Sequence, residues 1–376
     1  MKIRSLSLAF YFAVCAPLAS ADTIKVKTAT GNIQVKTIAE GLQNAWGMAF
    51  LPNGSMLVTE RPGRMRIVSA DGKLGEPLSG LPKIFAQGQG GLLDVVLAPD
   101  FATSKKIYFS YSEPGEGGRN STAVSSATLN GNKLENLTTV FSQKPKVDSG
   151  NHFGSRLVWA PDGTLFITLG DRYSEKDKAQ TLDNHQGKVI RINADGSVPQ
   201  DNPFVKTPGA LPEIWSYGHR NMQGAALNPI TKELWTGEHG PQGGDELNID
   251  RAAKNYGWPV ITYGENYGGG KIGEGTHKAG MEQPIYKWVP SIATAGFIFY
   301  TGDKFPQWKN NILLTSLREQ TLVRLVVDGE KITKEERLLG KELGQRLRHV
   351  VQGPDGLVYL LTDESKSKIY QLSPAQ

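Results

Sequence analysis

Residues 160–167 read Ala-Pro-Asp-Gly-Thr-Leu-Phe-Ile. Proline suits the second position of a tight turn, and aspartate and glycine suit the positions that follow it. The apolar run after the turn is typical of a β-strand. This stretch therefore predicts a tight turn that leads directly into a buried strand.

The same pattern occurs six times in the 376-residue chain. The turns are centred on Pro52, Pro99, Pro161, Pro229, Pro306 and Pro354, and the apolar runs include Met56, Ile107, Leu165, Leu234, Ile312 and Val358. Successive prolines lie 47 to 77 residues apart, and one four-stranded propeller blade takes roughly 40 to 50 residues. We therefore predict an all-β fold, a six-bladed β-propeller with four-stranded antiparallel blades around a central channel. Two all-β domains of three units each are the alternative, although no linker-like segment divides the chain.

The N-terminal segment indicates a secreted protein. Two basic residues precede the apolar residues 6–18, and Ala19-Ser20-Ala21 provides the small side chains that a signal peptidase accepts. The apolar stretch is too short to span a bilayer, which takes about 20 residues. We therefore predict a cleaved signal peptide over residues 1–21, a periplasmic location without membrane insertion, and a single catalytic propeller domain over residues 22–376.

Charge and cysteine content exclude several classes of protein. The formal net charge is +5, from 42 Lys and Arg against 37 Asp and Glu. This charge is small and forms no basic stripe, which argues against nucleic-acid binding. The only cysteine, Cys15, lies in the predicted signal peptide. The mature chain would therefore have no disulfide, cysteine-rich zinc site or iron–sulfur cluster.

Two loops carry side chains suited to moving a proton and stabilising charge. His152 stands in the glycine-flanked loop 150–154, and histidine is the side chain best suited to accept a proton near neutral pH. Arg220 and Asn221 can present a cation and an amide to a carbonyl or carboxylate oxygen. The alternatives are a histidine held by a neighbouring carbonyl and an arginine that pairs with an acid between blades.

A third loop is rich in oxygen donors. Residues 237–246 combine carboxylates with several glycines, and residues 255–259 add another turn-rich segment. Calcium prefers hard oxygen ligands in a flexible loop. The spacing does not match an EF-hand, and an acidic loop without an ion is the alternative.

Late basic residues form a fourth group. Arg346 and Arg348 alternate in a predicted strand, so we expect both side chains on one face, and Arg318 precedes them. Such arginines suggest an acidic ligand, with a surface ion-pair network as the alternative. Gln89 and Trp288 add a polar and a stacking candidate. Because blade-end loops converge around the channel of a propeller, the four groups would share one basin.

Together these motifs resemble the soluble quinoprotein glucose dehydrogenase family, most closely its periplasmic aldose sugar dehydrogenases, which use pyrroloquinoline quinone (PQQ) and calcium. The resemblance extends from about Ile38 to Leu372. The matching segments are residues 88–93, 151–154, 218–221, 238–241, 245–246, 255–259 and 346–348, in the family's order and approximate spacing.

The resemblance implies a role for each matching residue. His152 corresponds to the base that takes the proton of the sugar's anomeric hydroxyl, and Arg220 and Asn221 correspond to the pair that contacts the quinone oxygen. The remaining matches are cofactor contacts at Gln89, Arg318, Arg346 and Arg348, carbonyl ligands of the cofactor's calcium at Gly240 and Pro241, ligands of a second, structural calcium at Glu246 and the carbonyl of Tyr256, and positions near the sugar at Trp288 and Asn151.

Three positions depart from the glucose dehydrogenases of the family. Asn151 replaces an aspartate just before the base, Arg318 replaces a lysine that contacts the quinone, and Ile285 replaces an aromatic residue near the sugar. These differences imply a sugar site that is more open or less specific for glucose.

The resemblance therefore implies an enzyme that oxidises aldose sugars at C1 to lactones and passes two electrons to PQQ, and from there to an unidentified acceptor. The oligomeric state is open between a monomer and a homodimer. Two other classes of function are the alternatives: a calcium-dependent lactonase-type propeller hydrolase, and a non-catalytic sugar- or protein-binding propeller.

Overall fold

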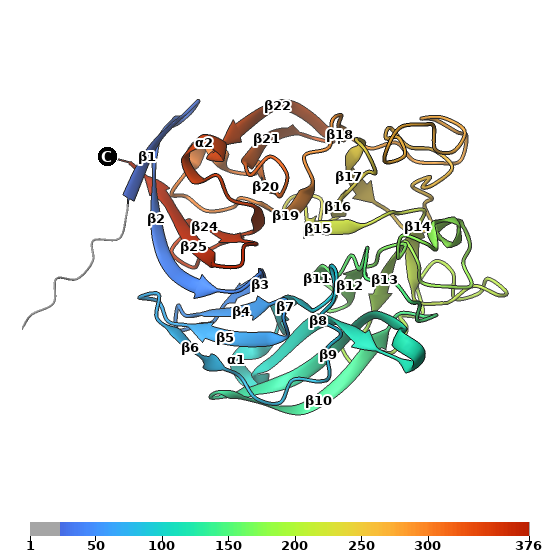
Figure 1. Ribbon diagram of the computed structural model, residues 1–376, viewed down its shortest axis with the longest axis horizontal. Coiled ribbons are helices and arrows are strands. Elements are labelled where there is room, and N and C mark those ends of the chain that lie inside the picture. Colours follow the sequence, from blue (N-terminus) through green and yellow to red (C-terminus); the bar gives the residue numbers. More distant parts are fainter. Residues whose placement is uncertain (1–22, 376) are drawn as a thin grey trace, which may run out of the picture.

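The computed structural model describes residues 23–375, which form six antiparallel β-sheets arranged as the blades of one ring (Figure 1). The predicted signal peptide, residues 1–21, lies outside the described residues. The first strand of every blade contacts the first strands of its neighbours, so these strands line the central axis. The predicted six-bladed propeller is confirmed. The two-domain alternative is wrong, because the sixth blade packs against the first.

The first five blades each consist of four consecutive strands. Blade 1 contains β3 (Ala45–Phe50), β4 (Met56–Glu60), β5 (Arg64–Val68) and β6 (Leu74–Pro77); blade 2 contains β7 (Leu92–Leu97), β8 (Lys106–Pro114), β9 (Asn120–Asn130) and β10 (Lys133–Ser142). Blade 3 contains β11 (Leu157–Trp159), β12 (Leu165–Thr168), β13 (Lys188–Ile192) and β14 (Ile214–Tyr217). Blade 4 contains β15 (Met222–Leu227), β16 (Leu234–Glu238), β17 (Asp245–Asp250) and β18 (Tyr286–Trp288); blade 5 contains β19 (Thr294–Phe299), β20 (Ile312–Ser316), β21 (Leu322–Asp328) and β22 (Lys331–Leu338).

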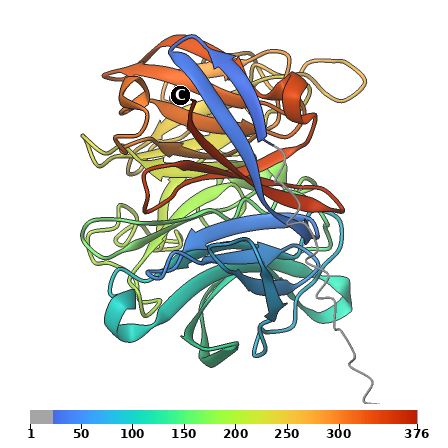
Figure 2. The same cartoon turned by 90° about the vertical axis from the view of Figure 1, so that its left-hand side faces the viewer.

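Blade 6 closes the ring by joining both ends of the described chain. The strands β23 (Leu347–Gln352), β24 (Val358–Thr362) and β25 (Ser367–Pro374) are followed by β2 (Gly31–Leu42), and β1 (Thr23–Thr28) adds a fifth strand. Figure 2 shows the blue N-terminal strands beside the C-terminus. In this pairing Val35 lies opposite Leu372.

Leu372→Ala should weaken this closure strongly. Leu372 is fully buried and belongs to the core that also contains Val35, Val358 and Leu360. Truncating such a leucine removes buried apolar surface and leaves a cavity, so the free energy of unfolding should fall by about 2–5 kcal/mol. Urea unfolding measures the change, with the partly exposed Ser373→Ala as the control. An unchanged midpoint for Leu372→Ala would mean that the seam contributes little to stability.

All six predicted turns connect the first and second strands of a blade, and all six predicted apolar runs lie in second strands. The helices are short: α1 (Phe101–Ser104), α2 (Gly340–Leu343) and the 3₁₀ turns η1 (Glu116–Gly118), η2 (Lys176–Gln180) and η3 (Pro306–Trp308). Within residues 23–375, no helix has the length and apolar character needed to cross a membrane.

A buried arginine fills the centre of the ring. Arg156 donates to Asp94 Oδ1 at 3.1 Å, to the Gln223 carbonyl at 2.7 Å and to the Arg348 carbonyl at 3.3 Å. Its guanidinium also lies 4.1 Å from the ring centroid of Trp46. Burial lowers its pKa to about 10, with Asp94 acting in the opposite direction, so the group stays charged at neutral pH. Five of the six blades thus meet at one side chain.

Candidate active site

The topology gathers the candidate site residues at one end of the ring. His152 and Arg220 lie before the first strands β11 and β15, whereas Gly240 and Arg318 follow the second strands β16 and β20. First and second strands run antiparallel. The start of a first strand and the end of a second strand therefore lie at the same end of the blade.

His152 is buried and paired with a carboxylate. Its Nδ1 lies 2.6 Å from Asp171 Oδ1. The backbone N–H of Tyr173 donates to Oδ1 and the indole N–H of Trp258 donates to Oδ2, both at 2.7 Å. The partner of this histidine is thus a carboxylate, and the alternative of a neighbouring carbonyl is wrong.

The pair assigns a protonation state to each member. Burial disfavours ionised Asp171, but the hydrogen bond and charge of His152 keep the pKa of this carboxyl below its ordinary value. Burial lowers the pKa of His152, and Asp171 offsets only part of this effect. An ionised Asp171 accepts the proton of Nδ1–H, which leaves Nε2 of a neutral His152 as a proton acceptor.

Two candidate cofactor residues also support the His152 loop. Gln89 Oε1 accepts the His152 backbone N–H at 2.9 Å. Asn221 Oδ1 accepts the Gly154 backbone N–H at 3.1 Å. These bonds connect the loop to blades 2 and 4, which fixes the imidazole between them.

Arg172 secures the other side of this loop. It is buried and donates from Nε to the Asn151 carbonyl at 3.0 Å and from Nη1 to the Asn120 carbonyl at 2.9 Å. Its guanidinium lies 4.0 Å from the Phe153 ring centroid. The neighbouring Gly170 cannot be replaced without movement, because a Cβ there would lie 1.9 Å from the His152 carbonyl oxygen. Asn151 itself is partly buried beside the base.

Arg220 is fixed by backbone carbonyls. Nη1 donates to the carbonyls of His239 at 3.0 Å and Gly240 at 2.8 Å, and the guanidinium lies 5.3 Å from a Trp258 ring centroid. Its backbone N–H, but not its guanidinium, bonds to Glu238. The buried Nε has no hydrogen-bond partner. The alternative of an arginine that pairs with an acid between blades is therefore wrong.

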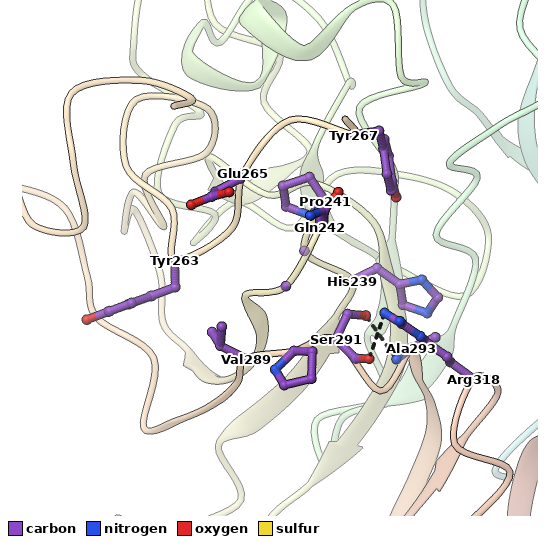
Figure 3. A pocket seen from close by; sticks show the side chains of 13 residues that line it. His239, Pro241, Gln242, Tyr263, Glu265, Tyr267, Val289, Ser291, Ala293 and Arg318 are labelled. Atoms are coloured by element: carbon purple, nitrogen blue, oxygen red, sulfur yellow. Dashed lines mark hydrogen bonds between the residues drawn. The ribbon is translucent and has the colours of Figure 1, made fainter. Parts of the chain in front are cut away.

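Two adjoining cavities open beside these residues. The larger, of about 710 Å³, is lined by Gly240, Pro241 and the exposed Arg318. Figure 3 shows Pro241 and Arg318 among the lining side chains. The second, of about 340 Å³, is lined by His152. Pro241 and Tyr267 line both cavities. A ligand in the larger cavity would therefore lie next to a ligand in contact with the base.

Three arginines face one carboxylate near this basin. The buried Arg348 donates to Asp363 and Gln223, and Arg61 Nη2 lies 3.8 Å from Asp363 Oδ1. Burial, and then the charge of Arg348, lowers the pKa of Arg346. The cluster carries excess positive charge. A surface ion-pair network does not describe it, because Arg348 is buried.

The expected alternation of the last two arginines needs a correction. Arg346 is exposed and precedes β23 by one residue, whereas Arg348 lies within that strand and is buried. The pairing with β24 also shifts register between Leu347 and His349. The simple one-face rule for a regular strand therefore does not apply here.

A third, small cavity is lined by acidic and carbonyl-bearing residues, among them Glu246, Tyr256, Glu238 and Gly240. Burial, and then the charge of Glu238, raises the pKa of Glu246 to about 8. Within residues 23–375, no three His, Cys, Asp or Glu side chains are grouped as a metal site. A cation here would need backbone carbonyls as well as carboxylates, which calcium accepts.

Trp288 is not part of the basin. It lies in the fourth strand of blade 4, is 3% exposed, and its indole N–H donates to Glu335 at 2.9 Å. Ile285 packs against the same core. Neither residue lines the two large cavities. The side chain is enclosed between blades 4 and 5, and the aromatic contact to the sugar expected from Trp288 stays a prediction.

The sequence motifs did not reveal several important neighbours of His152. Asp171 and Tyr173 contact it from the β12–β13 loop. Trp258 lies in the β17–β18 connection and bonds to Asp171. One signal was present for Asp171. It comes directly after Gly170, shortly after the buried second strand β12, and Gly240 lies in the equivalent loop after β16. Nothing in the local sequence around Trp258 marks it as a partner of Asp171.

Comparison with known proteins agrees with this geometry. The chain is 48% identical over 351 residues to the aldose sugar dehydrogenase YliI of Escherichia coli (strain K12), covering 92% of this chain and 94% of the relative. The crystal structure of the soluble aldose sugar dehydrogenase from Escherichia coli in its apo-form has a TM-score of 0.89 at 48% identity, covering 91% of this chain and 100% of that chain.

A cofactor-bound structure is also similar. The PQQ-bound aldose sugar dehydrogenase from Streptomyces coelicolor has a TM-score of 0.73 at 27% identity, covering 95% of this chain and 100% of that chain. The family model described as glucose / sorbosone dehydrogenase matches residues 42–371. The resemblance seen in the loop motifs is thereby confirmed, and this chain belongs to the glucose / sorbosone dehydrogenase family.

Proposed function

We propose that this chain is a periplasmic, PQQ- and calcium-dependent enzyme that oxidises aldose sugars at C1 to lactones. The observation that carries the proposal is the His152–Asp171 pair, which presents a neutral base to a cavity adjoining a larger, arginine-lined one. The cofactor is named in the PQQ-bound relative, and the sugar class is named in the Escherichia coli relative.

The arginines near the larger cavity fit an anionic quinone. Arg318 lines this cavity, and Arg346 Nη1 donates to the carbonyl of the preceding Leu317 at 3.4 Å. Arg61, Arg346 and Arg348 lie around the carboxylate of Asp363, and Arg346 also lies near Glu364. The buried Nε atoms of Arg348 and Arg220 have no hydrogen-bond partner. Guanidiniums are suited to binding carboxylates, so this cluster, Gln89 and Arg318 would hold the acidic cofactor, with its calcium at the carbonyls of Gly240 and Pro241.

The chain's own residues would then divide the reaction between them. PQQ, when bound, supplies the acceptor for the hydride of the sugar's C1–H bond. His152 takes the proton of the C1 hydroxyl at Nε2, and Asp171 holds Nδ1–H and stabilises the imidazolium that forms. Arg220 and Asn221 provide a fixed cation and amide where negative charge grows. Loss of one hydride and one proton turns the C1–OH group into the lactone carbonyl.

Reconstitution tests the proposal directly. The purified chain is mixed with calcium and PQQ, an aldose is added, and the reduction of an artificial dye is followed. Dye reduction that requires sugar, PQQ and calcium together is the expected result. Lactone hydrolysis without PQQ would instead indicate a hydrolase, and sugar binding without either reaction would indicate a binding protein.

The pH dependence of the reaction should follow His152. Burial lowers the pKa of this imidazole below 6.5, although Asp171 acts against the shift. The base works only when neutral, so kcat/KM should fall as the pH drops through this lowered pKa and should be level just above it. An acid limb with a midpoint above 6.5 would contradict the assignment.

Calcium should stabilise the fold through the small acidic cavity. Calcium at one hundred times its Kd should raise the free energy of unfolding by about 2.7 kcal/mol per site. Glu246→Gln should reduce this gain, because a charged ligand is lost. Glu274→Gln, which alters an exposed acid of the long β17–β18 connection, is the matched control. Equal calcium responses in both variants would remove Glu246 from the ligand set.

A further inference from the structure

The carboxylate beside the base divides its two oxygens between different donors. Oδ1 of Asp171 bonds to His152 Nδ1 at 2.6 Å and to the Tyr173 backbone N–H at 2.7 Å. Oδ2 accepts the indole N–H of Trp258 at 2.7 Å, which is its only hydrogen bond within residues 23–375. Asp171 is fully buried. The indole is therefore the donor that balances the pull of His152 on this carboxylate.

Trp258 lies between the two halves of the proposed reaction machinery. Its buried side chain packs against Ala179 and Ile272 in a small cluster of its own. A ring of the indole lies 5.3 Å from the Arg220 guanidinium. The side chain thus contacts both the acid that holds the base and the cation placed where negative charge would grow.

A pair of side-chain amides holds Trp258 in this place. Gln180 is the last residue of η2, in the β12–β13 loop that also carries Asp171. Its Nε2 donates to the Trp258 carbonyl at 2.7 Å and to Asn255 Oδ1 at 3.0 Å. Asn255 Nδ2 donates back to Gln180 Oε1 at 2.8 Å. The loop that presents the carboxylate therefore also fixes the backbone of its indole donor.

The charge of Asp171 acts directly on the base. Burial lowers the pKa of His152, and the hydrogen bond and charge of Asp171 raise it. The charges of Arg220 and Arg172 act in the same direction as burial. The charged and titratable groups that face His152 are Asp171, Arg172, Tyr173, Lys176, Arg220 and His239. Asp171 is the acid among these groups, so a donor that stabilises its charge weakens the attraction of the imidazole for a proton.

We propose that Trp258 is a positioning residue that keeps His152 a weak, neutral base by bonding to the second oxygen of Asp171, and that Gln180 holds the indole there. A hydrogen bond to an ionised carboxylate stabilises its charge. Without the indole N–H, Asp171 would stabilise the imidazolium more strongly, and His152 would already be protonated at a higher pH. The part of this inference that concerns sugar oxidation rests on the proposed function.

Trp258→Phe tests the role of the indole N–H, because phenylalanine keeps an aromatic ring. In the PQQ- and calcium-loaded enzyme, the acid limb of kcat/KM should move to higher pH. On the level part of the profile, kcat/KM should fall roughly tenfold, since a hydrogen bond to a charged group is lost. A limb that stays in place or moves to lower pH would overturn the proposal, because general loosening of the His152–Asp171 pair has that effect.

Trp159→Phe is the matched control. Trp159 lies at the end of β11 that is remote from His152, and its indole N–H has no hydrogen-bond partner. Loss of this N–H should change neither the acid limb nor the level part of the profile. A shift of the limb equal to that of Trp258→Phe would overturn the assignment to Trp258.

A double-mutant cycle tests whether Gln180 acts through Trp258. Gln180→Met keeps the length of the side chain but removes its amide, so the acid limb should move in the same direction as in Trp258→Phe. Once the indole N–H is absent, Gln180→Met should add no further shift. Gln200→Met, at an exposed glutamine, is the control. Shifts that simply add in the double variant would overturn the role of Gln180.

NMR separates failure of this inference from failure of the proposed function. The full chain is labelled with ¹³C-histidine, and the imidazole signal that is absent in His152→Gln is followed through a pH titration without sugar. Trp258→Phe should raise the midpoint of this signal. If no aldose is oxidised, the proposed function fails, but the titration still reports on the base. Identical titration curves in wild type and Trp258→Phe would overturn the positioning role even in an active enzyme.

Discussion

His152→Gln should lower kcat by roughly 10²- to 10⁴-fold, the usual contribution of a general base. Glutamine keeps a polar side chain of similar reach but cannot take a proton at neutral pH. The backbone N–H that bonds to Gln89 is unaffected by the substitution. The loop should therefore keep its position, and PQQ should bind with nearly unchanged affinity, as measured by titrating the apo-protein.

The control for this variant is His277→Gln. His277 is exposed on the long β17–β18 connection and lines neither large cavity, so its loss should leave turnover unchanged. Near-full activity of His152→Gln would show that another group accepts the proton. Loss of PQQ binding together with turnover would show that His152 holds the cofactor.

Asp171→Asn should lower kcat/KM by roughly 10³-fold although the side chain keeps its size. An ionised aspartate accepts the Nδ1 proton of His152, whereas an amide N–H₂ donates to Nδ1 and drives the proton onto Nε2, where the base must be free. The Trp258 indole N–H can still bond to the amide oxygen, whereas the Tyr173 backbone N–H loses its acceptor at the Oδ1 position.

The pH profile identifies Asp171 as a positioning residue. The hydrogen bond and charge of Asp171 raise the pKa of His152 against the effect of burial. The acid limb of the remaining activity should therefore move to lower pH in Asp171→Asn. Asp201→Asn, at an exposed acid that pairs with Arg191, is the matched control. An unshifted acid limb in Asp171→Asn would mean that the loss of activity is only structural.

The fold was predictable because its signals are local. A proline followed by aspartate or glycine specifies a turn over a few residues, and the apolar run after Pro161 or Pro354 specifies a strand without reference to the rest of the chain. The blade order follows because consecutive strands pair. The β2–β25 pairing, by contrast, joins segments more than 300 residues apart, and no local pattern marks it.

The site was only partly predictable, because its contacts are not local. The motif containing His152 was visible, but its partner Asp171 is 19 residues away and Trp258, which bonds to Asp171, is a further 87 residues along. Trp288 shows the opposite difficulty, because the structure places it outside the two large cavities. Its sequence does not distinguish the fourth strand of a blade, which is remote from the axis, from a strand that lines the site.

The arginine that fills the centre of the ring also determines how molecules reach and leave the site. Arg156, with Asp94 and Trp46 around it, closes the axis below the cavities. The central channel is therefore blocked, and the site opens at one end of the ring. Under the proposed function, the sugar and the electron acceptor must use the same entrance. Each turnover then consists of two binding steps in succession. The lactone has to leave before the electron acceptor can bind, and an excess of sugar or of acceptor inhibits binding of the other.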